Sequence, residues 1–123
     1  MNYNLKINDK QAKVISMALD FYSRMIGAQF QSLLHVEAWD KQENIREAEN
    51  LLYEVKKLLT GLKHNVNPGI TMVNNNAKIA YDLHQVIRHR LAWDENPEGD
   101  FWNVFFDTPM QVSDQPLAEI NKE

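Results

Sequence analysis

The sequence contains no cysteine among its 123 residues. This absence excludes disulfides, thiolate zinc sites and cysteine nucleophiles. No apolar run approaches the roughly 18 residues that a membrane-spanning helix requires. The start of the chain, residues 1–11, is polar and lacks the apolar centre of a signal peptide. We therefore expect a cytoplasmic protein that makes no contact with a membrane.

The chain also lacks an excess of positive charge, because its formal net charge at pH 7 is −4. General nucleic-acid binding depends on basic residues that neutralise phosphates, so we expect no such binding. The content of 44% hydrophobic and 24% charged residues is typical of a soluble globular protein. The length fits a single helical domain that spans residues 1–123.

Motifs of familiar enzymes are missing as well. Neither a Gly-x-x-x-x-Gly-Lys nor a Gly-x-Gly-x-x-Gly phosphate loop occurs, and no serine follows the glycine-rich pattern of a nucleophile elbow. Glu43, Glu47 and Glu54 line one helix face, like the metal-binding acids of all-α nucleotide pyrophosphatases, but with the wrong spacing. Two magnesium ions would be under-coordinated there. We therefore predict no enzyme, no catalytic residue, no metal and no cofactor.

Two segments have the patterns of short β-strands. Residues 3–7 alternate apolar and polar side chains, and residues 101–106 are rich in aromatic and β-branched side chains. Helical patterns fill the chain between them. The predicted fold is mainly α, a three-helix antiparallel bundle with short N- and C-terminal β-strands in the order β-α-α-α-β. The two strands would pair as a small sheet resting on the helices.

The first predicted helix extends from about residue 9 to residue 36. Asp20 and Arg24 stand four residues apart on its polar side, as in a favourable ion pair. At about 1.5 Å per residue the helix would be ~40 Å long, which is long for so small a domain. We therefore expect either a break near Gly27 or a partner chain that covers the overhang. Its broad apolar face comprises Val14, Met17, Ala18, Phe21, Tyr22, Met25, Ala28 and Phe30.

The second predicted helix follows a possible capping box, Asp40 with Glu43. Its apolar residues recur at intervals of three and four, as in the seam of a packed helix pair. Leu51 and Leu58 make this seam wider than a helix with one neighbour needs. The width of the seam, like the length of the first helix, favours a homo-oligomer.

The third predicted helix begins at the asparagines 74–76 and ends near Trp93. His84 and His89 are five residues apart and therefore about 140° apart around the axis, so they cannot share a metal ion. Tyr81, His84 and Arg88 share one flank of the helix. Together they offer a phosphate or carboxylate an arginine fork, an imidazole and an aromatic ring.

Two interpretations of this helix remain open. In one, a small anionic ligand binds there, helped by the free N–H groups at the helix N-terminus; the candidate ligand-binding residues are Tyr81, His84, Arg88, Arg90, Trp93 and Asn75. In the other, the two arginines pair with glutamates of the second helix and the histidines lie at the edge of the core. The second arrangement is the commoner one in proteins.

Two stretches resemble segments of small, uncharacterised proteins that tailed-phage and prophage genomes encode. The first covers residues 9–30 and includes Gly27, Gln29 and Phe30; the second covers residues 77–99 and includes Tyr81-Asp82, Ile87-Arg88 and Ala92-Trp93. The resemblance implies a phage accessory protein in the cytoplasm of the host cell. It implies no particular activity.

The leading hypothesis is a non-enzymatic phage accessory protein that binds and neutralises a host factor, for example one of antiviral defence. The tryptophans Trp39, Trp93 and Trp102 are expected at the surface and favour binding. The target is either a host protein, met by the acidic surface as a decoy for a nucleic-acid-binding groove, or a small nucleotide-like ligand at a subunit junction. The alternative is a structural or replication accessory protein with no defence role.

Overall fold

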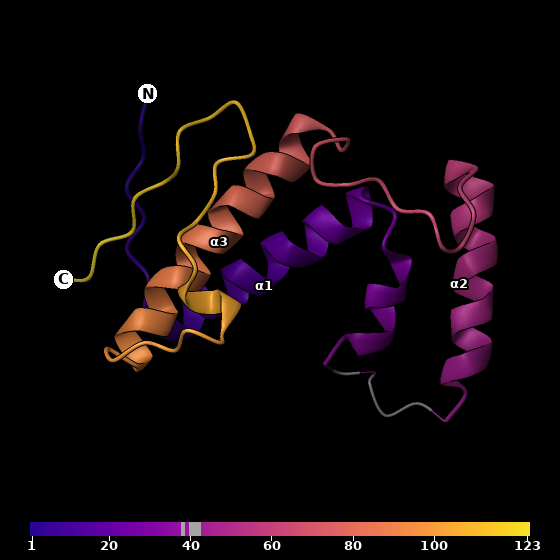
Figure 1. Cartoon of the computed structure of the whole chain (residues 1–123), viewed down its shortest axis with the longest axis horizontal. Coiled ribbons are helices and arrows are strands. Elements are labelled where there is room, and N and C mark those ends of the chain that lie inside the picture. The colour runs from indigo at the N-terminus through magenta and orange to yellow at the C-terminus, as the bar shows by residue number, and fades with distance from the viewer. Residues whose placement is uncertain (38, 40–42) are drawn as a thin grey trace.

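The computed structural model describes residues 1–37, 39 and 43–123. Figure 1 shows two long helices side by side at one end of the molecule and a third helix standing apart at the other end. The elements in chain order are α1 (Asp9–Ile26), the 3-10 helix η1 (Phe30–His35), α2 (Ile45–Thr60), α3 (Asn75–Glu95) and the 3-10 helix η2 (Val104–Phe106).

The two predicted terminal β-strands are wrong, since no described residue lies in a strand. Residues 1–8 form no strand; Lys6 makes an exposed ion pair with Glu123 at 3.0 Å, and Asn8 caps α1. Residues 101–106 form a turn and η2, because Asp100 accepts a hydrogen bond from the N–H of Trp102 and Asn103 accepts one from the N–H of Phe105, each at 3.0 Å. Such local acceptors compete with a strand ladder for the backbone.

The predicted first helix is broken, and the break is where the sequence indicated it. α1 begins with a capping box in which Asn8 and Gln11 exchange side-chain-to-backbone hydrogen bonds of 2.9 Å. It ends at Ile26, with Gly27 as its C-cap. Ala28 then adopts a φ of +61°, a left-handed conformation that turns the chain away from the helix axis. Of the two alternatives that the sequence left open for the long helix, the structure shows the break near Gly27.

The core of the molecule lies between α1 and α3, which run antiparallel (Figure 1). The buried side chains of α1 are small and allow α3 to approach closely, whereas those of α3 also include larger ones such as His84 and Gln85. On α1 they are Ala12, Ser16 and Ser23, and on α3 they include Ala77, Ala80, Val86 and Ile87.

α2 packs on η1 and, among the described residues, makes no contact with α1 or α3. The structure therefore contains a helix pair and a separate helical arm where the sequence predicts a compact three-helix bundle. The wide apolar seam of α2 stays largely uncovered, with Leu58 and Leu59 83% and 73% exposed. Asp40, the expected cap of this helix, lies outside the described residues.

The C-terminal segment crosses α3 and is fastened to it by side chains of that helix. Asp82 is buried and accepts hydrogen bonds from the N–H groups of Val112 and Ser113, at 2.9 and 3.1 Å. Gln85 bonds both the N–H and the carbonyl of Met110, at 3.3 and 3.0 Å. These bonds satisfy backbone groups that have no strand or helix partner.

We predict that two glycine substitutions with matched backbone geometry will differ in cost. Gly61 and Gly99 both have positive φ angles, +72° and +76°. An added Cβ meets nothing at Gly61, but at Gly99 it would lie 2.8 Å from the Trp93 ring. Gly61→Ala should lower the free energy of unfolding by about 1 kcal/mol through backbone strain alone, and Gly99→Ala by about 2–3 kcal/mol. Urea unfolding measures both, and equal losses would contradict the packing of Trp93 on Gly99.

Candidate functional site

The flank of α3 that carries Tyr81, His84 and Arg88 faces α1 and η2. The Tyr81 and His84 rings lie 6.3 Å apart between centroids, and an Nη of Arg88 lies 3.5 Å from Nε2 of His84. The structure therefore keeps these three residues together, as the sequence pattern indicates.

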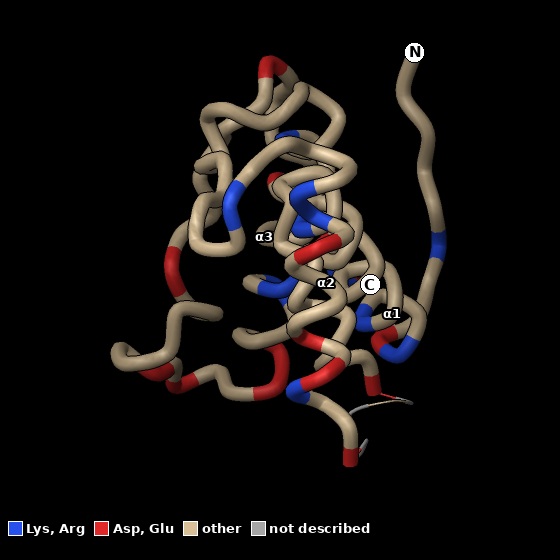
Figure 2. Tube along the Cα trace, turned by 90° about the vertical axis from the view of Figure 1, so that its right-hand side faces the viewer, with Lys and Arg blue, Asp and Glu red and all other residues tan. Residues whose placement is uncertain are grey.

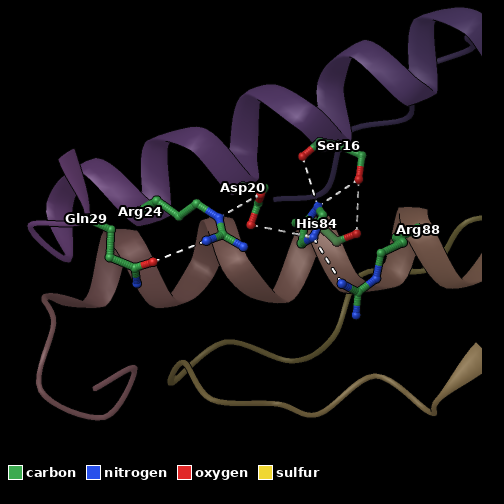
Figure 3. Close-up of polar contacts among 6 residues, drawn as sticks. All are labelled: Ser16, Asp20, Arg24, Gln29, His84 and Arg88. Atoms are coloured by element: carbon green, nitrogen blue, oxygen red, sulfur yellow. Dashed lines mark hydrogen bonds and ion pairs between the residues drawn. The ribbon is translucent and has the colours of Figure 1, made fainter. Parts of the chain in front are cut away.

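His84 is buried and joins α3 to α1 through Ser16 (Figure 3). Its Nδ1 lies 2.9 Å from the carbonyl oxygen and 2.8 Å from the hydroxyl of Ser16. The Ser16 hydroxyl in turn donates to the carbonyl of His84 at 3.3 Å. Since a carbonyl can only accept, Nδ1 carries the proton and Nε2 is the unprotonated nitrogen of the neutral ring.

Ser16, His84 and Asp20 do not have the arrangement of a catalytic triad. A triad needs a ring nitrogen that is free to accept the proton of the serine hydroxyl, but the Nδ1 nearest Ser16 is already a donor. Asp20 lies on the other side of the ring, 3.7 Å from Nε2. Ser16 is buried and borders neither of the two cavities described below. The cluster therefore holds two helices together and does not expose a nucleophile.

Burial lowers the pKa of His84 below its usual 6.5, because the interior disfavours the charged ring. The positive charges of Arg88 and Arg24 act in the same direction, whereas Asp20 and the Ser16 carbonyl oppose them. Arg24 itself is held by Asp20 at 3.0 Å and by the side-chain oxygen of Gln29 at 3.2 Å (Figure 3). The polar cluster is therefore arranged around a neutral imidazole.

The positive charge of Arg88 remains available to bind an anion. Its guanidinium lies 5.1 Å from the centroid of the Phe105 ring, in a cation–π contact. Within the described part of the chain, no carboxylate forms an ion pair with it. The expected pairing of Arg88 and Arg90 with glutamates of the second helix is wrong, because α2 stands apart from α3.

The other three predicted ligand-binding residues lie elsewhere and have partners within the chain. Arg90 forms an ion pair with Asp94, four residues further on, at 3.0 Å. Trp93 packs edge-to-face against Phe106, with 5.2 Å between ring centroids. The structure therefore does not gather the six predicted residues into one site.

Asn75, the last of the six, does contact an anion at the N-terminus of α3, but the anion belongs to the chain itself. Its side-chain amide donates to the carboxylate of Asp114 at 2.8 Å. Hydrogen bonds from Gln115 and Asn75 lower the pKa of Asp114 below its usual value. The helix terminus thus fixes the C-terminal segment in place.

Three further residues make long-range contacts that the sequence analysis did not predict. Asp82 and Gln85 hold the C-terminal segment, as described above, and Lys56 is fully buried with its ammonium donating to Asn67 at 2.6 Å and to the carbonyl of His64 at 3.3 Å. Asp82 and Gln85 stand next to apolar positions of the buried side of α3, and this placement could have indicated that their side chains are buried. Nothing in the sequence around Lys56 indicates its burial.

Two cavities accompany these elements. A polar pocket of about 230 Å³ lies between α1, the segment before α3, and Tyr81, and is bordered by Asp20, Arg24 and Gln29 among others. A larger groove of about 410 Å³ separates η1 from α2, and its lining is entirely apolar: Leu33, Leu34, Trp39, Ile45, Ala48, Leu51, Leu52 and Val55.

The most exposed aromatic side chains lie in the turn before η2. Phe101 and Trp102 are 101% and 98% exposed. Successive local hydrogen bonds hold this turn, including Gly99 N–H to the carbonyl of Asn96 and Asn103 N–H to the carbonyl of Asp100, at 3.0 and 3.2 Å. The two rings therefore project into solvent from a fixed backbone.

No protein-family profile, no curated protein and no solved structure matches this chain. Within the described ranges, no helix has the length and apolar character needed to cross a membrane. The same residues include no group of three histidine or acidic side chains placed to hold a metal ion.

We predict that acid will destabilise the fold through His84. The unfolded chain binds a proton at His84 near pH 6.5, whereas the folded chain resists protonation until lower pH. The unfolded state therefore binds more protons in this window, and stability falls as the pH drops below 6.5.

Urea unfolding at pH 7.5 and 5.5 measures this loss. His84→Gln should unfold more easily at pH 7.5 and lose less stability between the two pH values than the unchanged chain. His35→Gln, at an exposed position, is the matched control and should keep the original pH dependence. The same pH dependence in His84→Gln and the unchanged chain would rule out His84 as its source.

Proposed function

We propose that this chain is a non-enzymatic binding protein that neutralises a protein partner. The main support for a binding function is the turn on which the side chains of Phe101 and Trp102 are fully exposed to solvent. Exposed aromatic side chains, tryptophan in particular, often dominate protein interfaces, and placing them on a hydrogen-bonded turn reduces the backbone entropy lost on binding. The polar residues of α3 are instead occupied by contacts within the chain.

The charge around the aromatic turn indicates what kind of partner fits. Residues 94–107 contain five acidic side chains and no lysine or arginine, and all five are exposed. Figure 2 shows acidic positions gathered in the lower half of the molecule, the half in which Figure 1 places this segment. A basic groove with an apolar pocket complements such a surface. We therefore propose that the partner is a nucleic-acid-binding protein, whose groove the acidic segment occupies.

The resemblance to phage-encoded proteins supports a host factor as the partner, with counter-defence as the role. An accessory role in phage structure or replication is the alternative. In that role the chain would bind a phage protein through the same surface. Whether the captured partner comes from the host or from the phage therefore distinguishes the two roles.

We predict that Phe101→Ser combined with Trp102→Ser will weaken partner binding by at least about 100-fold, as expected for two central aromatic residues. The tagged protein would be used to capture partners from bacterial cells, and the captured protein would then be purified and titrated by calorimetry. Met72→Ser, at a 78% exposed position outside the turn, is the control and should bind normally. Nucleic acid should compete with the chain for the partner. A partner that the double variant still binds tightly, or with which nucleic acid does not compete, would contradict the proposal.

A second candidate function has one observation in its favour, the free guanidinium of Arg88 above the Phe105 ring. A small nucleotide-like anion would pair with this charge and stack on the exposed aromatic ring.

For this candidate we predict an adduct of a few hundred daltons in native mass spectra of the gently purified protein. Arg88→Ala should remove the adduct, whereas Arg90→Ala should retain it, because Arg90 is already paired with Asp94. If neither the purified protein nor protein incubated with a panel of nucleotides carries an adduct, the ligand-binding function is wrong.

A further inference from the structure

Two apolar helix faces of this molecule are only partly covered by the other described residues. The first, which we call the α2 face, is formed by Ile45, Leu51, Val55, Leu58 and Leu59, all exposed. At about 100° per residue these side chains fall on one broad side of the helix. η1 lies opposite part of this side, where Ile45, Leu51 and Val55 line the apolar groove of about 410 Å³. The end of the face, with Leu58 and Leu59, is bare.

The second face lies on α1, on the side turned away from α3. Ala12, Ser16 and Ser23 are the buried residues of α1, and the residues about 180° around the axis from them are also apolar. We call this second side the α1 outer face; it comprises Val14, Met17, Ala18, Phe21 and Met25. Val14 and Met17 are 65% and 59% exposed. Thus α1 has two apolar sides: one packs on α3, and the other is partly exposed, with Phe21 and Met25 half-buried.

The α1 outer face is where the third helix of a bundle would pack, and α2 is the helix that the sequence pattern assigns to that place. In the described part of the chain α2 touches neither α1 nor α3, and Figure 1 shows it held away from them beyond η1. In a single copy, the α2 face and the α1 outer face, which would form a helix–helix contact, are therefore partly exposed to water. Continuous apolar surfaces of this kind on a soluble protein mark interaction sites.

The two faces match each other in length and in charge. α1 has 18 residues and α2 has 16, so the two helices are about 27 and 24 Å long. The exposed acids Glu47 and Glu54 border the α2 face, and the exposed Lys10 lies at the N-terminal end of the α1 outer face, in line with its apolar residues. Opposite charges at the edge of an apolar seam select the partner and its orientation.

We propose that the chain forms a two-fold dimer in which the α2 face of each copy packs on the α1 outer face of the other. Each copy supplies one face of each kind, so two identical contacts form and the assembly closes. The partner's α2 replaces the helix that is missing from the local bundle. The aromatic turn at Phe101 and Trp102 belongs to neither face, so this dimer is independent of the function proposed above.

Sedimentation of the purified protein tests the dimer, because no other component is needed. The unchanged chain should sediment as a dimer at micromolar concentration. Leu58→Glu with Leu59→Glu, or Val14→Glu with Met17→Glu, should each weaken the dimer on the order of 100-fold or more, since each places charge in both contacts. Met72→Glu with Met110→Glu changes two equally exposed apolar residues outside the faces and should leave the dimer intact. Circular dichroism establishes that each variant remains helical.

Mixing the two interface variants tests which faces meet. In the proposed dimer a copy with a changed α2 face and a copy with a changed α1 outer face still share one unaltered contact, so the mixture should form heterodimers although neither variant dimerises alone. A contact between two α2 faces predicts instead that the α1 variant dimerises normally by itself. Packing of α2 on the α1 outer face of its own chain predicts a monomer throughout. Either of these results would overturn the proposal.

A charge exchange at the rim provides a test that does not place charge in the apolar faces. Lys10→Glu alone, or Glu47→Lys with Glu54→Lys, should weaken the dimer several-fold, most strongly at low salt. The triple variant that combines these changes should recover dimerisation, because the opposite charges face each other again. Additive weakening in the triple variant would contradict the proposed pairing. Partner capture through Phe101 and Trp102 is a separate measurement, so failure of one proposal does not imply failure of the other.

Discussion

The buried contact between Ser16 and His84 is the constraint on which the rest of the structure depends. It joins α1 to α3 in a core whose buried apolar side chains are few and mostly alanines, so little apolar area is available to hold the two helices together. The contact works only with a neutral ring whose Nδ1 donates to Ser16. Once α3 is fixed in this way, its opposite flank is free to hold the C-terminal segment through Asp82 and Gln85.

In this arrangement several polar side chains are buried, whereas several large apolar and aromatic side chains are exposed to solvent. Leaving a buried donor or acceptor unpaired costs about 1–3 kcal/mol, so the buried His84 and Asp82 are committed to the partners that they have. The leucines of α2 and the aromatic side chains of the turn have no such partners and face solvent. Recognition by this chain is therefore expected to depend on apolar and aromatic surface, with acidic residues selecting the partner.

Helix locations and the break at Gly27 could be predicted, because they follow from residues close together in the chain. Helical periodicity and the turn at Gly27 act within a few residues. The same local reasoning failed at residues 101–106, where Asp100 and Asn103 supply acceptors that favour a turn over a strand. It also failed for α2, because periodicity shows that a helix has an apolar face but does not identify what covers that face.

The sequence by itself determined the helical class, the approximate bounds of α2 and α3 and the shared flank of Tyr81, His84 and Arg88. Only the tertiary structure decided what those residues meet. Ser16 and His84 are 68 positions apart, and Asn75 and Asp114 are 39 apart. No local pattern encodes such pairs, because the free energy of each depends on burial and on the approach of distant segments. The residues that looked most suited to binding a ligand were therefore largely those that the fold uses to hold itself together.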